Sequence, residues 1–120
     1  MPLKVKRVYE AAAKVDGMRI LVDRLWPRGI AKEKAKIDLW MKQIAPSNSL
    51  RTRFHAKPEK WDTFLEAYAA ELEADEAVEA AKELRRHIRK GTVTLLYAAR
   101  DEAHNNAVAL KAWLTRRKRS

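Results

Sequence analysis

Two short stretches of the chain carry side chains that can hold a charged group or move a proton. In the first, residues 23–28, one carboxylate, two guanidiniums and an indole follow a run of apolar residues. The second, residues 97–106, combines a phenol, a guanidinium, two carboxylates, an imidazole and two neighbouring amides. A guanidinium binds a carboxylate or a phosphate through parallel hydrogen bonds, and amides can orient the bound group. We therefore predict a site for a small anionic molecule between the two stretches.

Each candidate residue has an expected role in this site. If the site is catalytic, the groups that transfer protons are expected to be Asp23, His104 and Tyr97. Ligand binding is assigned to Arg7, Tyr9, Arg24, Trp26, Arg28, His55, Asp101, Asn105 and Asn106. These residue types fit either a binding protein or an enzyme, and they do not specify a reaction.

Three of these residues also have a simpler interpretation. Asp23 could form an internal ion pair with Arg24 or Arg28 that only locks the loop. His104 could be a hydrogen-bonding residue at a helix end instead of a general base. His55 precedes a predicted helix and could cap it. The sequence leaves both interpretations open for each residue.

The predicted site depends on strands that end at the same edge of a sheet. Strands are predicted for residues 18–25, with an apolar run at 20–22, and for residues 92–99, and they lead directly into the two polar stretches. In open α/β sheets, ligands bind beyond the carboxyl ends of parallel strands. Residues 3–9 predict a third strand near a sheet edge, but the short connection that follows leaves its direction open. If this strand is parallel, Arg7 and Tyr9 join the same crevice.

Helices are predicted for most of the remaining chain. The predicted helices cover residues 31–45, 48–54 after an N-cap at Ser47, 58–74 and 75–90 before Gly91, and a last helix capped by Asp101. The expected fold class is therefore α/β. It consists of a small, mainly parallel central sheet of about three strands flanked by helices, in a single domain over residues 1–120.

The composition makes the chain strongly and unevenly basic. The formal charge is +10; residues 1–60 hold 15 Lys and Arg against 6 Asp and Glu, whereas residues 61–120 hold 11 against 10. Such a field favours anionic partners without choosing among them. The absence of cysteine excludes disulfides and thiolate chemistry and fits a reducing compartment. No signal sequence or membrane-spanning run is predicted, so we expect a cytoplasmic protein.

Two other classes of function remain open. The first is a nucleic-acid-associated protein. It would use Lys4, Lys6, Arg7, Lys32, Lys34, Lys36 and Arg116–Arg119, the last within a basic tail over residues 115–120 that is expected to be flexible. The second is a structural or partner-binding domain without catalysis. No cofactor or metal is predicted, because the histidines lack metal-ligand spacing and there is no glycine-rich phosphate loop. The sequence does not indicate an oligomeric state.

Several motifs fall in an order typical of one protein family. They are Leu21–Gly29, Leu39–Trp40, Ile44–Ser47, Phe54–His55, Pro58–Trp61 and Thr94–Ala99, followed by Asp101–Ala107. With them, the chain from Val5 to Leu114 resembles the YeaO-like branch of the domain-of-unknown-function 488 family. The resemblance implies a compact α/β fold with a shared pocket at these positions, but no established activity. The wider family often carries cysteines where this chain has Tyr97 and Asn105, so thiol or metal chemistry is not implied here.

Overall fold

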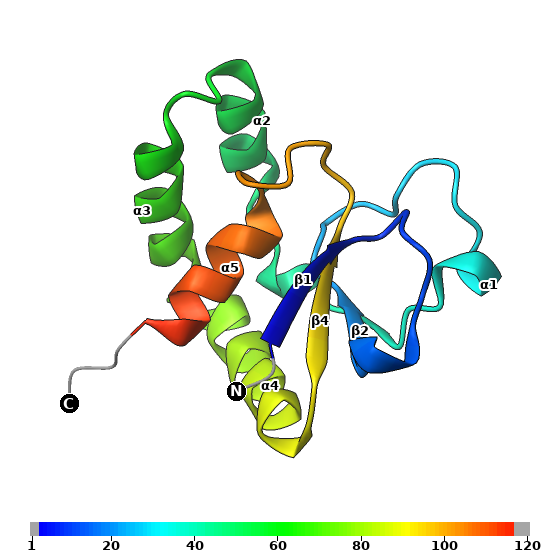
Figure 1. The fold of residues 1–120 in the computed structure, drawn as a ribbon. Coiled ribbons are helices and arrows are strands. Elements are labelled where there is room, and N and C mark those ends of the chain that lie inside the picture. Colours follow the sequence, from blue (N-terminus) through cyan, green and yellow to red (C-terminus); the bar gives the residue numbers. More distant parts are fainter. Residues whose placement is uncertain (1–2, 117–120) are drawn as a thin grey trace.

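The fold is built on a four-stranded parallel sheet with the strand order β1-β4-β2-β3 (Figure 1). The computed structural model describes residues 3–116, apart from the side chain of Asp75. The strands are β1 (Leu3–Arg7), β2 (Met18–Leu21), β3 (Leu39–Trp40) and β4 (Val93–Tyr97). Short 3-10 turns are η1 (Lys14–Asp16) and η2 (Lys42–Ile44). The prediction of an α/β fold around a mainly parallel sheet is confirmed.

β1 runs parallel to β4, which settles the direction that the sequence left open. The register pairs Leu3 with Val93 and Arg7 with Tyr97. Because β4 lies between β1 and β2, the connection over residues 8–17 has to cross only one strand. The carboxyl ends of β1, β4 and β2 therefore lie at the same edge of the sheet. β1 forms an edge strand, as predicted.

The predicted helix over residues 31–45 is wrong. Within it, α1 (Lys32–Ala35) is the one α-helical segment, η2 is a short 3-10 turn, and Leu39–Trp40 forms β3, which pairs with β2 and adds a fourth strand to the sheet. The backbone N–H of Met41 donates to the carbonyl of Leu21 at 2.9 Å. β2 therefore takes the backbone groups that a continuous helix would have used, and this tertiary pairing overrides the local helical spacing.

The longer helices follow the predicted pattern. They are α2 (Asn48–Ala56), α3 (Trp61–Leu72), α4 (Asp75–Lys90) and α5 (Asn106–Thr115). The N-cap of α2 is Ser47, whose hydroxyl accepts the N–H of Leu50 at 3.1 Å, and α4 ends at Gly91, as predicted. Figure 1 shows these four helices gathered on one side of the sheet, with α1 on the other side. Among residues 3–116, no helix has the length and apolar character needed to cross a membrane.

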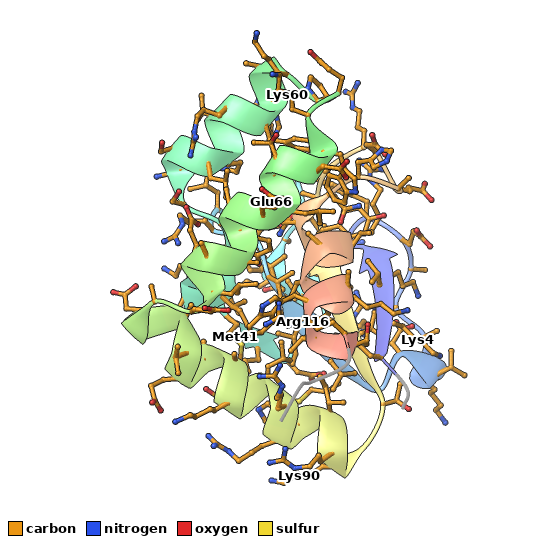
Figure 2. All side chains as sticks on the ribbon, turned by 90° about the vertical axis from the view of Figure 1, so that its left-hand side faces the viewer. Lys4, Met41, Lys60, Glu66, Lys90 and Arg116 are labelled. Carbon is orange, nitrogen blue, oxygen red and sulfur yellow. The ribbon has the colours of Figure 1, made fainter. Side chains whose placement is uncertain are left out.

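The two faces of the sheet bury different side chains. On the helical side, which Figure 2 views face on, the sheet residues Ile20 and Leu95 pack in a large core with Tyr68 and Leu84 of the helices. The opposite face buries a smaller cluster of Val8, Leu21, Ala35 and Leu96, with Trp26 and Trp40 packed against it. The loops between β2 and β3 therefore cover this second face, and their packing fixes the path of the chain after β2.

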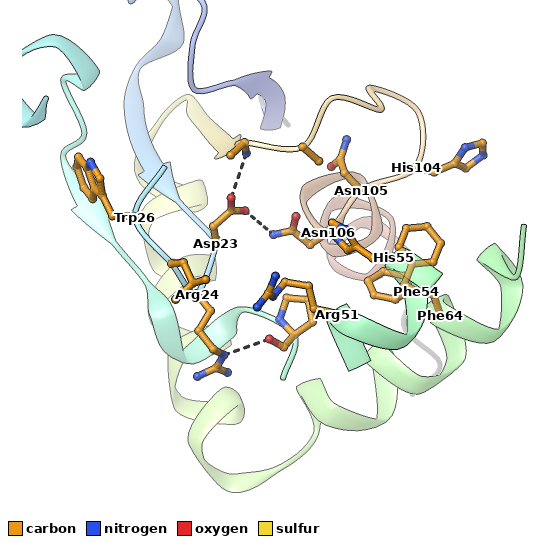
Figure 3. A pocket seen from close by; sticks show the side chains of 14 residues that line it. Asp23, Arg24, Trp26, Arg51, Phe54, His55, Phe64, His104, Asn105 and Asn106 are labelled. Carbon is orange, nitrogen blue, oxygen red and sulfur yellow. Dashed lines mark hydrogen bonds between the residues drawn. The ribbon is translucent and has the colours of Figure 1, made fainter. Parts of the chain in front are cut away.

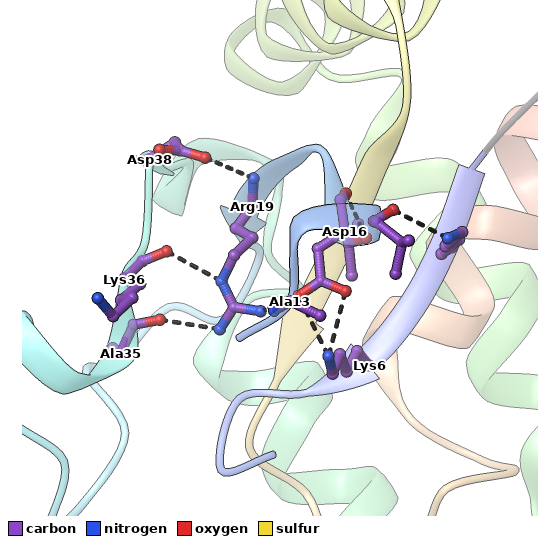
Figure 4. Close-up of polar contacts among 10 residues, drawn as sticks. Lys6, Ala13, Asp16, Arg19, Ala35, Lys36 and Asp38 are labelled. Carbon is purple, nitrogen blue, oxygen red and sulfur yellow. Dashed lines mark hydrogen bonds and ion pairs between the residues drawn. The ribbon is translucent and has the colours of Figure 1, made fainter. Parts of the chain in front are cut away.

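A buried ion cluster holds the start of β2 (Figure 4). The carboxylate of Asp16 accepts hydrogen bonds from Lys6 at 3.1 Å and from the buried guanidinium of Arg19. The same guanidinium donates to the carbonyls of Lys36 at 2.9 Å and Ala35 at 2.8 Å, which fixes the end of α1. Burial opposes ionisation of Asp16, but its hydrogen bonds to the backbone, Lys6 and Arg19 outweigh burial and lower its pKa. Because the charges are paired, we assign this cluster a structural role.

The first two residues of the predicted basic tail, Thr115 and Arg116, are placed against the helices. Thr115 is the last residue of α5, and the guanidinium of Arg116 lies 3.7 Å from the carboxylate of Glu73 and over the ring of Trp113. Residues 117–120 lie outside the described part of the chain.

Candidate functional site

A pocket of about 270 Å³ opens at the carboxyl ends of β2 and β4 (Figure 3). It is closed by the loop after β2, the loop after β4, the start of α5 and one face of α2. Seven of the predicted site residues line it, namely Asp23, Arg24, Trp26, His55, His104, Asn105 and Asn106. The parallel sheet thus brings the two predicted stretches to one edge.

Three other predicted residues hold the loops of the pocket without lining it. Arg7 donates to the carbonyls of Ala99 at 2.9 Å and Ala98 at 3.3 Å, and its guanidinium lies 4.9 Å from the ring centre of Tyr9. The hydroxyl of Tyr9 donates to the carbonyl of Arg28 at 2.7 Å. These contacts tie the end of β1 to the loops that follow β4 and β2. The side chains of Arg7 and Tyr9 and the carbonyl of Arg28 therefore hold the edge of the sheet in place.

Asp23 joins three segments around the pocket. Its carboxylate accepts the backbone N–H of Ala98 at 3.0 Å and the side-chain amide of Asn106 at 2.9 Å. Burial raises the pKa of Asp23, although these hydrogen bonds and the charge of Arg51 act against burial. Among the described residues, Asp23 forms no ion pair with the two arginines of its own loop. The internal ion pair considered from the sequence is therefore wrong.

Arg24 is largely committed to the backbone. Its Nε donates to the carbonyl of Pro46 at 3.1 Å, and its Nη2 donates to the carbonyl of Ala45 at 3.1 Å. These bonds attach the loop after β2 to the turn that precedes α2. Arg24 adds positive charge to the pocket, and two of its five N–H donors are bound to the backbone.

Arg51 lines the pocket and was not identified from the sequence. One terminal nitrogen donates to the side chain of Asn48 at 3.1 Å. Its Nε is buried and has no hydrogen-bond partner within the described part of the chain. Figure 3 shows the guanidinium reaching from α2 toward Asp23 and Asn106. The pocket therefore contains a second arginine, and its buried Nε–H is a donor without a partner in the described residues.

Phe54 and Phe64 form an apolar wall that was also missed as part of the site. Their ring centres are 4.6 Å apart, and both residues line the pocket. Arg51, Phe54 and His55 stand at i, i+3 and i+4 on α2, a spacing that places side chains on one helical face. This spacing was the sequence signal that could have identified Arg51.

His104 stands at the rim of the pocket. Its ring lies edge to face on Trp61 with ring centres 4.9 Å apart, and its Nδ1 is 3.5 Å from the carboxylate of Asp101. The side chain is about half exposed, and Figure 3 shows it turned away from Asp23. The two predicted acid–base residues therefore share the pocket without facing each other. Among residues 3–116, no three His, Asp or Glu side chains form a group that could hold a metal ion.

The last helix begins later than predicted. Its N-cap is Asn105, whose side-chain oxygen accepts a backbone N–H of the first turn at 2.9 Å. The predicted cap, Asp101, instead accepts the N–H groups of Ala103 and His104 at 2.9 Å in a turn before the helix. Asn and Asp are both favoured N-caps, so the path of the loop decides which one caps the helix. Asp101 consequently does not line the pocket.

Tyr97, the third predicted acid–base residue, belongs to the core. Its side chain is buried and is absent from the lining of the described pocket. Burial raises the pKa of its hydroxyl, and the carboxylates of Glu102 and Glu10 raise it further. The placement of Tyr97 favours a structural role.

Several cations considered for nucleic-acid binding are engaged within the fold. The Lys4 ammonium donates to the carbonyl of Val15 at 2.9 Å, and Lys6 pairs with Asp16. Arg7 is bound to the carbonyls after β4. Of these three cations only Lys6 is paired with a carboxylate; Lys4 and Arg7 keep their charge, but their contacts occupy donors that a phosphate backbone would need.

The comparison with known proteins decides the family. A model of the family DUF488-N3i, described as the inactive DUF488-N3 subclade, matches residues 2–120. The chain belongs to this family. It is 46% identical over 114 residues to the uncharacterized protein YeaO of Escherichia coli, covering 95% of this chain and 97% of that protein. It is 39% identical over 115 residues to the uncharacterized protein Rv3073c of Mycobacterium tuberculosis, covering 96% and 95%. No solved structure matches the chain.

The predicted membership in the YeaO-like branch of the domain-of-unknown-function 488 family is therefore confirmed. The relatives extend over almost the same length as this chain, so the DUF488-N3i fold described here spans nearly all of each relative.

We expect the stability of this DUF488-N3i protein to include a pH-dependent contribution from Asp23. An unfolded aspartate has a pKa of about 3.9, and burial raises the folded value. The folded state then binds the proton more tightly, so this contribution is complete below about pH 4 and is lost as the pH rises through the folded pKa. Asparagine does not titrate, so the Asp23→Asn variant does not lose stability in this way as the pH rises. Its free energy of unfolding relative to wild type should therefore increase from acidic to neutral pH in urea denaturation.

The matched control for this pH series is Asp62→Asn, which changes an exposed carboxylate on α3. The difference between this control and wild type should change less with pH than the difference for Asp23→Asn. If the free energy of unfolding of Asp23→Asn relative to wild type stays constant or falls with rising pH, the raised pKa of Asp23 in the folded state is contradicted.

Proposed function

We propose that the pocket binds a small anionic ligand that carries a carboxylate or a phosphate. The observation that carries the proposal is the guanidinium of Arg51, which lines the pocket and has a buried Nε without a partner in the described residues. An unpaired buried donor is costly, so a ligand oxygen that pairs with it stabilises the complex. Guanidinium groups form short, charge-assisted hydrogen bonds with carboxylate and phosphate oxygens.

The charge of the lining supports an anion over a cation. Among the described lining residues, Arg24 and Arg51 are permanent cations and Asp23 is the one carboxylate. Phe54 and Phe64 add an apolar wall that keeps water from part of the pocket. Electrostatic attraction is stronger where water is excluded. The pocket thus combines a net positive charge with an apolar surface.

Recognition without chemical conversion fits the site better than catalysis. Both oxygens of Asp23 already accept hydrogen bonds, and the ring of His104 is turned away from Asp23. The description of the DUF488-N3i subclade as inactive agrees with this choice. We therefore propose a binding role for the pocket.

Arg51→Gln is expected to weaken the binding of inorganic phosphate or benzoate by about 10- to 150-fold, since a hydrogen bond to a charged group contributes about 1.5–3 kcal/mol. Glutamine keeps a polar side chain at this position but removes the charge and the fork of donors. The dissociation constant can be measured by isothermal titration calorimetry or by NMR titration at low ionic strength, where charge interactions are least screened.

Arg53→Gln is the matched control. Arg53 lies on the same helix, is exposed, and lines a neighbouring groove between α2 and α3 instead of this pocket. Its substitution should leave the affinity close to that of wild type. Loss of binding in Arg53→Gln but not in Arg51→Gln would place the anion in the neighbouring groove. Equal loss in both variants would indicate diffuse attraction, and absence of binding by the wild type would also overturn the proposal.

A further inference from the structure

We infer that the ligand of this pocket is a small zwitterion of the amino-acid type. Its ammonium group would lie beside Asp23, its carboxylate beside Arg51, and its apolar side chain against Phe54 and Phe64. The inference rests on the proposed anion site and adds the chemical class of the ligand. The observation behind it is that Asp23 and Arg51, which have opposite charges, line one pocket without forming an ion pair.

Asp23 and Arg51 do not pair with each other. Both line the pocket, and the charge of Arg51 is close enough to act on the ionisation of Asp23. Among the ion pairs of the described residues, however, neither side chain takes part. Opposite charges that share a partly buried site attract each other strongly, so their separation requires other bonds to hold them.

Those bonds are present on both sides. The Asp23 carboxylate is held by the N–H of Ala98 at 3.0 Å and by the amide of Asn106 at 2.9 Å. The Arg51 guanidinium is held by the side chain of Asn48 at 3.1 Å. Moving either group to form a direct pair would disturb these hydrogen bonds. A ligand that bridges the two charges satisfies both without moving the backbone.

Asp23 has unused acceptor sites, and Arg51 has unused N–H donors. An ionised carboxylate offers about four acceptor sites and a guanidinium offers five N–H donors. Within the described residues, the hydrogen bonds to Asp23 are the two from Ala98 and Asn106, and the side-chain donation from Arg51 is the one to Asn48. Acceptor sites of Asp23 and N–H donors of Arg51 therefore remain open to groups of a ligand.

A purely anionic ligand meets only half of this requirement. Its negative group would pair with Arg51 but would also bring a like charge toward Asp23, which disfavours binding. An ammonium group on the same ligand replaces that repulsion with attraction and donates to the free acceptor sites of Asp23. This difference selects a zwitterion over a simple carboxylate.

The size and the wall of the pocket fit an apolar amino acid. The volume of about 270 Å³ is below the range of about 300–1,000 Å³ that is typical of pockets for drug-sized ligands. Figure 3 shows Phe54 and Phe64 side by side at the pocket, so an apolar side chain can pack against them, and Leu25 and Pro46 add further apolar lining. A charged or strongly polar side chain would lose hydration there.

Matched ligands test this inference directly. L-phenylalanine and hydrocinnamate share the ring and the carboxylate and differ in the ammonium group, and L-leucine and isocaproate form an aliphatic pair of the same kind. Wild type is expected to bind at least one amino acid about tenfold more tightly than its partner acid, a ratio that corresponds to about 1.4 kcal/mol. Asp23→Asn should reduce this ratio to near one. Arg51→Gln should weaken both members of a pair, and Arg53→Gln should change neither.

The outcomes separate this inference from the proposed anion site. If phosphate or the acids bind and the amino acids bind no more tightly, the anion site stands and the zwitterion is rejected. If no phosphate, acid or amino acid binds, both proposals are rejected. A ratio that Asp23→Asn leaves unchanged also overturns the inference. If Asp23→Asn fails to fold, the wild-type protein still tests the inference. L-phenylalanine, but not hydrocinnamate, should then shift the NMR signals of the Ala98 and Asn106 amides, which donate to Asp23. Equal shifts with both ligands would reject the zwitterion.

Discussion

Arg19→Met is expected to lower the free energy of unfolding by about 3–5 kcal/mol, the usual cost of removing one partner from a buried charge pair. The guanidinium of Arg19 donates to the carboxylate of Asp16 and to the carbonyls of Ala35 and Lys36. Methionine fills similar space without donating a hydrogen bond. Asp16 would then remain buried with less compensation, and the end of α1 would lose its attachment to β2. Urea denaturation followed by circular dichroism measures the change.

Lys82→Met provides the comparison with an exposed ion pair. Lys82 and Glu79 lie 3.6 Å apart on α4, and both side chains are mostly exposed. Exposed pairs contribute about 0–1 kcal/mol, so this variant should unfold close to wild type. Similar stabilities for Arg19→Met and Lys82→Met would show that the buried cluster is not needed for the fold.

Gly17→Ala is expected to destabilise the protein by about 2–5 kcal/mol, from backbone strain and from a steric clash. Gly17 has a φ of 65°, which side chains rarely tolerate, and an added Cβ would stand 2.3 Å from the carbonyl oxygen of Thr92. That oxygen already accepts the N–H of Met18 at 2.9 Å, so it cannot retreat without losing a hydrogen bond between the starts of β2 and β4. Thermal or urea unfolding checks the effect.

Gly91→Ala is the matched control for this change. A Cβ at Gly91 would meet no atom within 4 Å, and its backbone is extended. The substitution should therefore shift the free energy of unfolding by less than about 1 kcal/mol. An equal loss in both variants would mean that the close approach to Thr92 does not explain the requirement for glycine at position 17.

The parts of the fold that could be predicted have strong local patterns. Residues 92–99 are rich in β-branched and apolar residues, and α3 has a regular apolar face, so their pairing and packing agree with their local preference. Residues 31–45 failed because their apolar side chains face two different cores. Met41 and Ile44 pack on the helical side of the sheet, whereas Trp40 packs on the opposite side. A segment that crosses from one face to the other can imitate helical spacing.

The sequence could predict mainly those residues of the candidate site that closely follow a strand. Asp23 follows β2, and Asn106 starts the helix that follows β4, so parallel topology alone brings them to one edge. Arg51 comes from α2, whose position depends on long-range packing that no local pattern specifies. Tyr97 lies outside the lining of the pocket because of the alternation of side chains along a strand. It alternates along β4 in step with Val93 and Leu95, and all three side chains join the helical core instead of the pocket.

The central position of β4 also dictates when the sheet can be assembled. β1 and β2 each pair with β4 and not with each other, yet β4 is the last strand along the chain. During synthesis, the first strands therefore leave the ribosome long before residues 93–97 can close the gap between them. The helices α2, α3 and α4 need only local contacts and can form in the meantime. β2 can pair with β3 once residues 39–40 are made, but β1 and the other edge of β2 stay without their partner through most of translation. Exposed strand edges invite aggregation during this interval.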